Sequence, residues 1–481
     1  MRSKLPLLNA LLKYSKENNT IFSMPGNKGG KGFERDAIGS EFLKTMGKLD
    51  ITEVEPLDNL HHPQGVIKEA EKHLANLYNA KKAFFIVNGS SGGNLTAIFS
   101  AFKEGDEVLI ERNCHKSIYD AIILRKLKIV YIEPWVYEKG GLFLPPNKEN
   151  IYKAYEKCES PKGIILTYPN YYGISYDILE IVKDLKEKGL KVIIDEAHGA
   201  HYGITEKLPV NMASIADYTV LSAHKTLPAL TSGAYLLVND DSPDVEFFVS
   251  AFMTTSPSYL IMASLDYSRY YLESYGKNDY ENLIIEAEEK KKQINSLGKL
   301  RILMDEDIPD GYVLDKTRYV LIVESGYSGH KLLDYLRSKH IQAEMSFNNG
   351  VVLILSPSNW NEGIENLTKA INELDLKLLE EKEIETKIDV NINIPKKALE
   401  PYEVFNLESE ECDLLKSNGK ILKETITPYP PGIPIISSGE VIEKEIIERV
   451  VELKRAGVTI LGLSKGKIKV VKNRKIYTEG K

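Results

Sequence analysis

Short runs of apolar residues alternate with amphipathic stretches through the middle of the chain. Seven of these runs have the length and composition of buried strands: 83–87, 107–111, 129–133, 163–167, 191–195, 218–222 and 233–238. Stretches with apolar residues at helical spacing, such as Ile178 to Lys188, lie between them. Strands that alternate with helices are typical of a mainly parallel sheet with helices on both faces. The pattern therefore predicts a large α/β domain over residues 61–268.

The same pattern predicts a smaller α/β domain over residues 269–385. Its strands are expected at 318–323 and 351–355, and its helices at 330–339 and 362–374. The chain is thus predicted to contain a second sheet with its own covering helices.

The two ends of the chain have a different character. Residues 1–60 are rich in Gly and Lys and begin with a short amphipathic helix at Leu5 to Leu12, so we expect this segment to lie against a partner. Residues 386–481 are predicted to form a last α+β segment. Within it, Pro428 to Pro434 predicts a rigid extended stretch.

The composition fits a soluble enzyme of two or three domains. A length of 481 residues allows a large core, and a net charge of -7 gives no electrostatic case for nucleic-acid binding. The three cysteines, an odd and sparse number, are typical of a reducing cytosol. No apolar run reaches the length of about 18 residues that a membrane span needs, so no membrane partner is expected.

A carboxylate and a lysine each follow a predicted strand. Asp195 ends the apolar run 191–195, and Lys225 follows the run 218–222. Ligands of open α/β sheets bind beyond the carboxyl ends of the strands. A poorly hydrated lysine there favours its neutral amine, which a Schiff base requires, and a carboxylate can pair with a protonated pyridine nitrogen.

Two further features follow strands in the same way. The small-residue turn Asn88 to Gly93 joins a strand to a helix, and its N–H groups and helix dipole suit a phosphate, although an ordinary strand–helix turn has the same composition. Ser90 and Ser91 add hydroxyl donors. His115 follows the run 107–111, where its ring is placed either to stack on a cofactor or to play a structural role.

Two other patterns predict no site. Gly26 to Gly32 lacks the spacing of a nucleotide-binding P-loop. The pairs His61-His62 and His198-x-x-His201 have no third ligand at zinc spacing, so no metal is expected.

Six stretches of the chain carry a family resemblance. They are 24–28 (Met-Pro-Gly-Asn-Lys), 58–65, 113–117, 195–199, 222–227 (Ser-Ala-His-Lys-Thr-Leu) and 428–434 (Pro-Tyr-Pro-Pro-Gly-Ile-Pro). With them the chain resembles the pyridoxal-phosphate-dependent Orn/Lys/Arg decarboxylases, which share the aspartate-aminotransferase fold, fold type I. The matches extend over almost the whole chain, and the last two stretches together are quite specific. The resemblance implies a seven-stranded, mainly parallel sheet in the large domain.

The resemblance also implies a role for each candidate residue. Pyridoxal 5′-phosphate is the implied cofactor; Lys225 forms an imine with it, Asp195 pairs with its pyridine nitrogen, and His115 stacks on its ring. His198 lies near the cofactor or the substrate. The residues implied around the phosphate are Ser90, Ser91, Gly92, Ser222 and His224. Asn27 stands where the family usually has His, which puts a proton-transfer role at that position in doubt.

The implied reaction is decarboxylation of a basic amino acid to an amine and carbon dioxide, related to polyamine synthesis. Arginine is favoured as the substrate, followed by lysine or ornithine. Lys225 or His224 returns a proton to Cα, and the sequence leaves both open. The alternatives are another reaction of the same cofactor, such as transamination, and a non-catalytic binding or regulatory role.

Substrate recognition and assembly are further expectations. A carboxylate should bind the distal cation of the substrate. Glu440 is one candidate; its alternative is an exposed glutamate at a helix start. The resemblance implies a cytoplasmic homodimer or tetramer with shared active sites. The chain begins almost at the core of the expected fold, so we expect no N-terminal wing domain of the kind found in the longer inducible decarboxylases. Decamers built through that wing are therefore not expected.

Overall fold

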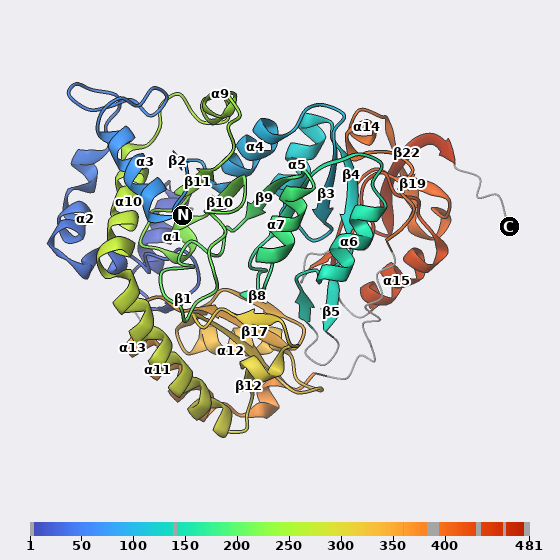
Figure 1. Cartoon of the computed structure of the whole chain (residues 1–481). Helices are drawn as coiled ribbons and strands as arrows, with labels where there is room; N and C mark the ends of the chain where they lie inside the picture. Colours follow the sequence, from blue (N-terminus) through green and yellow to red (C-terminus); the bar gives the residue numbers. More distant parts are fainter. Residues whose placement is uncertain are drawn as a thin grey trace.

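The computed structural model describes residues 4–137, 142–358, 360–381, 394–429, 434–455 and 458–475. A central sheet with its helices forms the middle of the molecule in Figure 1. A smaller sheet, coloured yellow and orange, lies below it, and the orange and red C-terminal part lies on the side of strands β3 and β4.

The central sheet has seven strands in the order β2-β11-β10-β9-β7-β3-β4. Their bounds are β2 (Lys82–Ile86), β3 (Glu107–Glu111), β4 (Lys128–Ile132), β7 (Pro161–Thr167), β9 (Lys191–Asp195), β10 (Tyr218–Leu221) and β11 (Ala234–Val238). The strands from β10 to β4 pair in parallel, whereas β11 runs antiparallel to both of its neighbours. The predicted mainly parallel seven-stranded sheet is confirmed.

Alternate residues of the central strands enter two different cores. Val108 and Ile110 pack in the core that contains helices α4 (Gly89–Ala101) and α5 (Lys116–Arg125). Leu109 lies between them in the sequence but packs in the core that contains α6 (Lys148–Glu156) and α7 (Leu179–Glu187). Because successive strand side chains point to opposite faces, this division shows that helices cover both faces of the sheet.

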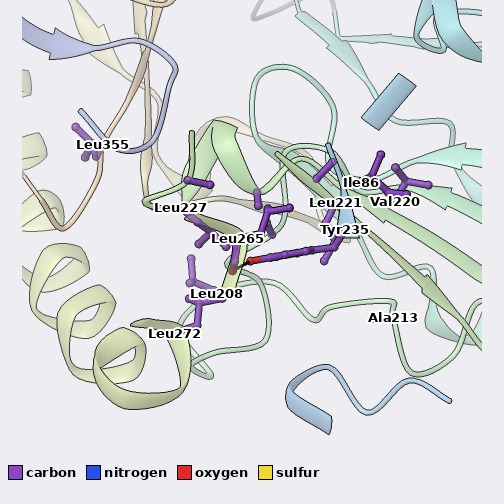
Figure 2. Close-up of a cluster of buried hydrophobic side chains, with 14 of the residues drawn as sticks. Ile86, Leu208, Ala213, Val220, Leu221, Leu227, Tyr235, Leu265, Leu272 and Leu355 are labelled. Carbon is purple, nitrogen blue, oxygen red and sulfur yellow. Dashed lines mark hydrogen bonds between the residues drawn. The ribbon is translucent and has the colours of Figure 1, made fainter. Parts of the chain in front are cut away.

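Tyr235 of β11 places a hydroxyl in the core beside β10 and β11, and this hydroxyl is hydrogen-bonded. Tyr235 is fully buried, and Figure 2 shows its hydroxyl donating to the carbonyl of Leu265 at 2.7 Å. Leu265 belongs to α10 (Tyr259–Tyr271), so this bond fixes that helix against the sheet.

A smaller antiparallel sheet forms the second α/β unit, in the strand order β12-β14-β17-β16. Its strands and helices are β12 (Arg301–Ile302), β14 (Arg318–Ile322), β16 (Met345–Phe347), β17 (Gly350–Ile354), α11 (Lys277–Ser296), α12 (Gly329–Ser338) and α13 (Trp360–Glu373). The predicted strands and helices of this unit are confirmed to within about two residues, the usual uncertainty of element ends.

The N-terminal segment packs largely within its own chain. Its elements are α1 (Pro6–Tyr14), β1 (Thr20–Phe22) and α2 (Ala37–Leu49), and α3 (Val66–Leu77) follows at the start of the predicted large domain. β1 pairs in parallel with β15 (Ile341–Ala343) of the smaller unit. This pairing crosses the predicted domain boundaries at 60 and 268. These boundaries and the one at 385 stay a prediction. Every residue of α1 is exposed.

The C-terminal part contains a three-stranded antiparallel sheet in the order β18-β22-β19. Its elements are α14 (Pro401–Phe405), β18 (Ser409–Asp413), β19 (Lys420–Leu422), β20 (Thr427–Tyr429), α15 (Lys444–Arg455), β21 (Thr459–Leu461) and β22 (Lys467–Lys475). β20 begins the predicted extended stretch Pro428 to Pro434, of which residues 430–433 lie outside the described residues.

The remaining elements connect these parts. They are β5 (Trp135–Tyr137), β6 (Leu142–Leu144), β8 (Ile174–Tyr176), α8 (Ala223–Thr226), α9 (Val245–Ala251) and β13 (Tyr312–Leu314). Within the described ranges, no helix combines the length and apolar character that crossing a bilayer requires.

Candidate active site

Lys225, Asp195 and His198 meet at the carboxyl edge of the central sheet. Asp195 is the last residue of β9, His198 lies in the turn after it, and Lys225 lies in α8 directly after the neighbouring β10. Lys225 Nζ is 3.0 Å from His198 Nε2. Two strand ends that are thirty residues apart in the sequence, from 195 to 225, therefore bring their polar residues to one place.

The surroundings of Lys225 favour its neutral amine. Burial lowers the pKa of this amine most strongly, and the charge of Arg318 lowers it further. The carboxylates of Asp195 and Glu344 have the opposite effect and raise it. The net effect is a pKa below the ordinary value of a lysine. A neutral amine has the lone pair that attacks a carbonyl carbon, so the site suits a nucleophilic lysine.

Asp195 is a buried carboxylate held by hydrogen bonds. It is 3% exposed. Its Oδ2 accepts from Asn94 Nδ2 at 3.1 Å and its Oδ1 from the Ala197 N–H at 3.2 Å. Among the described residues, no cation forms an ion pair with it. Because a buried negative charge is costly without a counter-charge, this geometry suits a protonated ring nitrogen.

His115 is connected to Asp195 through two polar side chains. It caps the N-terminus of α5, where its Nδ1 accepts from the Ser117 N–H at 3.2 Å and lies 2.8 Å from Ser117 Oγ. Asn94 Nδ2 donates to that Oγ at 3.0 Å as well as to Asp195. Burial lowers the pKa of His115. The charge of Asp195 raises this pKa, and the charge of Lys225 lowers it. A neutral imidazole in a fixed orientation suits stacking on a ring.

Ser90, Ser91 and Gly92 form the first turn of α4, a helix that lacks a side-chain cap. Asn88 occupies the N-cap position, but its Nδ2 donates to the Phe252 carbonyl at 2.6 Å. A side chain at Gly92 has no room, because its Cβ would lie 2.4 Å from Asn88 Oδ1. Uncapped N–H groups and the helix dipole make this turn suitable for an anion.

Ser222 and His224 flank the lysine at the next strand end. The Ser222 hydroxyl is fully buried and has no hydrogen-bond partner in the described part of the chain. His224 Nδ1 lies 2.9 Å from the Gly233 carbonyl, and burial lowers the pKa of its ring. A buried hydroxyl that bonds no described protein group is able to donate to a phosphate oxygen, so this position suits the phosphate.

These features together fit pyridoxal phosphate. Asp195 is a buried carboxylate that forms no ion pair within the described ranges, so it suits the ring nitrogen. The uncapped start of α4 and the unpaired Ser222 hydroxyl suit the phosphate. Lys225, with a lowered pKa, suits the aldehyde.

Several residues around Lys225 were not predicted from the sequence. Asn94 joins His115 to Asp195 but lies inside a predicted helix, where its polar side chain in an apolar setting was the only signal. Arg318 and Glu344 come from the smaller unit. No local pattern in the sequence connects them with the central sheet.

Glu344 is half-buried and held from two sides. Its Oε2 accepts from the Met24 N–H at 2.8 Å, and its Oε1 accepts from the Tyr171 hydroxyl at 3.1 Å. The ring of Tyr171 lies 4.9 Å from that of His198, centre to centre. This carboxylate also acts on the pKa values of Lys225 and Lys28, so it faces the cationic side of the site.

Asn27 has a structural role in the N-terminal turn. Its Nδ2 donates to the Ala229 carbonyl at 2.9 Å, and its Oδ1 accepts from the Gly30 N–H at 3.1 Å. Both ends of the amide are therefore engaged by the backbone, in agreement with the doubt about proton transfer at this position.

Glu440 lies in a buried ion pair rather than in an exposed helix start. Its side chain is 0% exposed, and it accepts from Arg112 Nη1 at 2.6 Å and Nη2 at 2.8 Å. The Ser437 N–H donates to it as well, at 2.7 Å. The alternative of an exposed glutamate is wrong, because α15 begins only at Lys444. As a substrate ligand Glu440 stays a prediction that this geometry does not favour, since its carboxylate is already engaged.

Comparison with protein families decides the class of the protein. A model of the Orn/Lys/Arg decarboxylase major domain matches residues 5–310, and a model of the C-terminal domain of the same family matches residues 382–459. The chain belongs to the Orn/Lys/Arg decarboxylase family. It is a pyridoxal-phosphate-dependent enzyme that decarboxylates basic amino acids.

Similar proteins agree with this assignment to the decarboxylase family. An uncharacterized protein of Bacillus subtilis is 34% identical over 93% of this chain and 94% of its own length. An arginine decarboxylase of Bacillus anthracis is 32% identical over 95% of this chain and 94% of its own. The constitutive lysine decarboxylase of E. coli has the same fold, with a TM-score of 0.76 and 19% identity, covering 97% of this chain and 82% of that one.

Asp195→Asn should strongly reduce decarboxylation. The amide keeps the size of the side chain but removes the negative charge that would hold a ring nitrogen protonated. We expect kcat to fall by at least about 100-fold, with weaker cofactor binding. Steady-state kinetics with a fluorescence titration of the cofactor measures both. Asp334→Asn, at an exposed residue of α12 paired with Arg337, is the matched control. Wild-type kinetics of Asp195→Asn would exclude this role.

Proposed function

We propose that this decarboxylase acts on arginine in preference to lysine and ornithine, with Lys225 as its catalytic lysine. The observation that carries the residue roles is a partly buried lysine of lowered pKa at the end of β10, beside the end of β9 and its buried carboxylate, Asp195. The choice of arginine is supported by the 32% identity to an arginine decarboxylase over 95% of the chain.

Pyridoxal phosphate, when bound, supplies an aldehyde for the substrate amine and a ring that withdraws electrons from Cα. The protein holds and tunes that ring. Asp195 would supply a fixed negative charge for its nitrogen, and His115 would cover one face of the ring and exclude water. Ser90, Ser91, Gly92, Ser222 and His224 are the residues that would hold its phosphate.

Lys225 is the better placed of the two candidate proton donors to Cα. His224 has its Nδ1 directed at the Gly233 carbonyl, which fixes its ring against the backbone. The Lys225 amine instead faces His198 and is free to exchange a proton with it. We therefore assign the proton return to Lys225, with His198 beside it.

Glu344 is our candidate for the residue that binds the distal cation of the substrate. The Met24 N–H and the Tyr171 hydroxyl fix its carboxylate, and its half-buried position leaves part of it open. Its charge acts on the Lys225 amine, which places it on the same site. A fixed carboxylate suits the planar guanidinium of arginine, which forms paired hydrogen bonds.

Glu344→Gln should raise the KM for arginine with a smaller change in kcat. The amide keeps the contacts with Met24 and Tyr171 partly intact but removes the charge that would attract a guanidinium. We expect a rise of about 10- to 100-fold, corresponding to about 1.5–3 kcal/mol for a hydrogen bond to a charged group. Glu373→Gln, on the exterior of α13, is the control. An unchanged KM would remove Glu344 from substrate recognition.

The reaction is tested by carbon dioxide release from cofactor-loaded enzyme given arginine, lysine and ornithine separately, without a keto acid. We expect release from arginine, with its amine formed in equal amount. Release from lysine or ornithine alone would overturn the substrate proposal. Amine formation that requires a keto acid would contradict decarboxylation itself.

We further propose that the enzyme is a cytoplasmic homodimer or tetramer with shared active sites, related to polyamine synthesis. Support for assembly comes from α1, where Leu7, Leu8, Leu11 and Leu12 are 49–72% exposed on a helix without a buried residue. An apolar helix surface of this kind is typical of an interface. Light scattering of the purified enzyme measures the mass; a monomer would contradict this part of the proposal.

A further inference from the structure

Arg318 of the smaller unit contacts the catalytic lysine indirectly, through His198. Arg318 begins β14 and is 3% exposed. Its Nη2 donates to His198 Nδ1 at 3.1 Å, and His198 Nε2 lies 3.0 Å from Lys225 Nζ. The three side chains therefore form a chain from the small sheet to the catalytic lysine, in which Arg318 and His198 are buried and Lys225 is partly buried.

The Arg318 side chain is held in place by contacts with Asp315 and Gly173. Its Nε lies 3.6 Å from Asp315 Oδ2, and the same oxygen lies 3.2 Å from His201 Nε2. Gly173, at φ +76°, lies against the arginine side chain, where an added Cβ would come within 2.8 Å of Arg318 Cδ. A residue with a side chain at Gly173 would displace Arg318, so the backbone leaves room for it.

The contact with Arg318 decides which nitrogen of His198 carries a proton. A guanidinium has five N–H donors and no acceptor, so His198 Nδ1 must accept. A neutral imidazole that accepts at Nδ1 carries its proton on Nε2. That N–H then faces Lys225 Nζ, which must offer a lone pair. An ammonium at Lys225 would place two donors against each other.

We propose that Arg318 is a positioning residue that, through His198, holds the free Lys225 as a neutral amine ready to condense with the cofactor aldehyde. This inference rests on the proposed role of Lys225 as the cofactor-binding lysine. In that condensation the amine lone pair forms the C=N bond, the nitrogen loses its protons, and the aldehyde oxygen leaves as water. An ammonium has no lone pair and cannot begin it.

The other charged groups around Lys225 do not replace this effect. Asp195 and Glu344 face the amine with negative charge and raise its pKa, opposing Arg318. The three neighbouring imidazoles, His115, His198 and His224, each have a pKa lowered by burial, so they add little positive charge near neutral pH. Arg318 is the permanent cation among the groups that act on this lysine.

The test measures the reactivity of Lys225 in enzyme freed of cofactor, so it does not depend on decarboxylation. Trace acetic anhydride acetylates neutral amines, and peptide mass spectrometry gives the extent at Lys225 against pH. The exposed Lys116 is the internal reference. The variants are Arg318→Met, which removes the charge, Arg318→Lys, which keeps it, and His198→Gln, which removes the imidazole. Arg301→Met, at a half-exposed arginine of β12, is the matched control.

We expect Arg318→Met to move the midpoint of the Lys225 profile upward by about one pH unit and to slow acetylation near neutral pH by about tenfold. Arg318→Lys should restore most of the wild-type profile. The effect of Arg318→Met should shrink in the His198→Gln background, because the connecting imidazole is gone.

An unchanged midpoint of the Lys225 acetylation profile in Arg318→Met would overturn the proposal. Equal shifts of this midpoint in Arg318→Met and Arg318→Lys would also overturn it, because they would show that lost packing, and not lost charge, causes the shift. If Arg318→Met does not fold, the acetylation profiles of Arg318→Lys and His198→Gln still test the proposal. A wild-type midpoint of the Lys225 profile in His198→Gln would show that the His198 ring does not carry the effect of Arg318 to Lys225. A missing decarboxylase activity with the expected acetylation profiles would contradict the proposed function and leave this inference intact.

Discussion

Lys225→Ala should abolish decarboxylation. The methyl group removes both the nucleophile that would hold the cofactor and the proposed proton donor to Cα, and no other described lysine is hydrogen-bonded to His198. Each role alone contributes about 10²–10⁴-fold, so we expect kcat to fall by at least about 10³-fold. Carbon dioxide release from arginine, lysine and ornithine measures the loss, and borohydride reduction followed by mass spectrometry shows whether any lysine still binds the cofactor.

Lys116→Ala is the control for the Lys225 experiment. Lys116 follows His115, is exposed and pairs with Asp120 on the surface of α5, so its loss should leave turnover nearly unchanged. Substantial activity in Lys225→Ala, with the cofactor still attached to another lysine, would disprove the assignment of the catalytic lysine.

Glu440→Gln should cause the largest loss of stability among single substitutions at charged residues. Arg112 and Glu440 are both 0% exposed, and the amide would leave the guanidinium buried without its counter-charge. Removing one partner of a buried ion pair typically costs about 3–5 kcal/mol. Because Arg112 comes from the end of β3 and Glu440 from the C-terminal part, the loss should weaken the attachment of that part. Urea unfolding followed by circular dichroism measures the change.

Two further variants test whether the loss of stability comes from the ion pair itself or would follow any glutamate substitution in this part of the chain. Glu408→Gln removes a carboxylate from an exposed pair with Lys472 and should have little effect. The double variant Arg112→Met/Glu440→Leu should lose less stability than Glu440→Gln alone, since apolar replacement of both charges leaves no buried charge unpaired. A stability of Glu440→Gln equal to that of the wild type would show that the pair contributes nothing.

The parts of the fold that were predicted from the sequence depend on local patterns. Each strand of the central sheet is a run of buried apolar residues, so its position is visible in its own composition. The residues at the strand ends followed from this, because parallel strands bring their carboxyl ends to one edge. Lys225 and Asp195 were found in this way, whereas His198 was implied by the family resemblance. The structure places the three residues together.

The parts that were not predicted depend on contacts between distant segments. Arg318 and Glu344 reach the site from the smaller unit, and nothing in their own neighbourhood connects them with residues 195–225. Glu440 follows Ser438 and Gly439, a context typical of an exposed helix start, but Arg112 binds it from 328 positions away. The role of Asn94 was not predicted for another reason. Its neighbours in the sequence are accounted for by the predicted helix, so nothing there indicated a functional residue.

The pairing of β1 with β15 has a consequence for the synthesis of the chain. Thr20 pairs with Ile341, and Met24 bonds to Glu344, 320 positions later. β1 is one of the first elements to be translated, but it stays unpaired until most of the polypeptide, including β15, has left the ribosome. Contacts of such long sequence separation form slowly, and exposed strand edges are prone to association. We expect ribosome-bound chains that stop before residue 341 to leave the first twenty-odd residues open to proteases and chaperones, whatever the state of the central sheet.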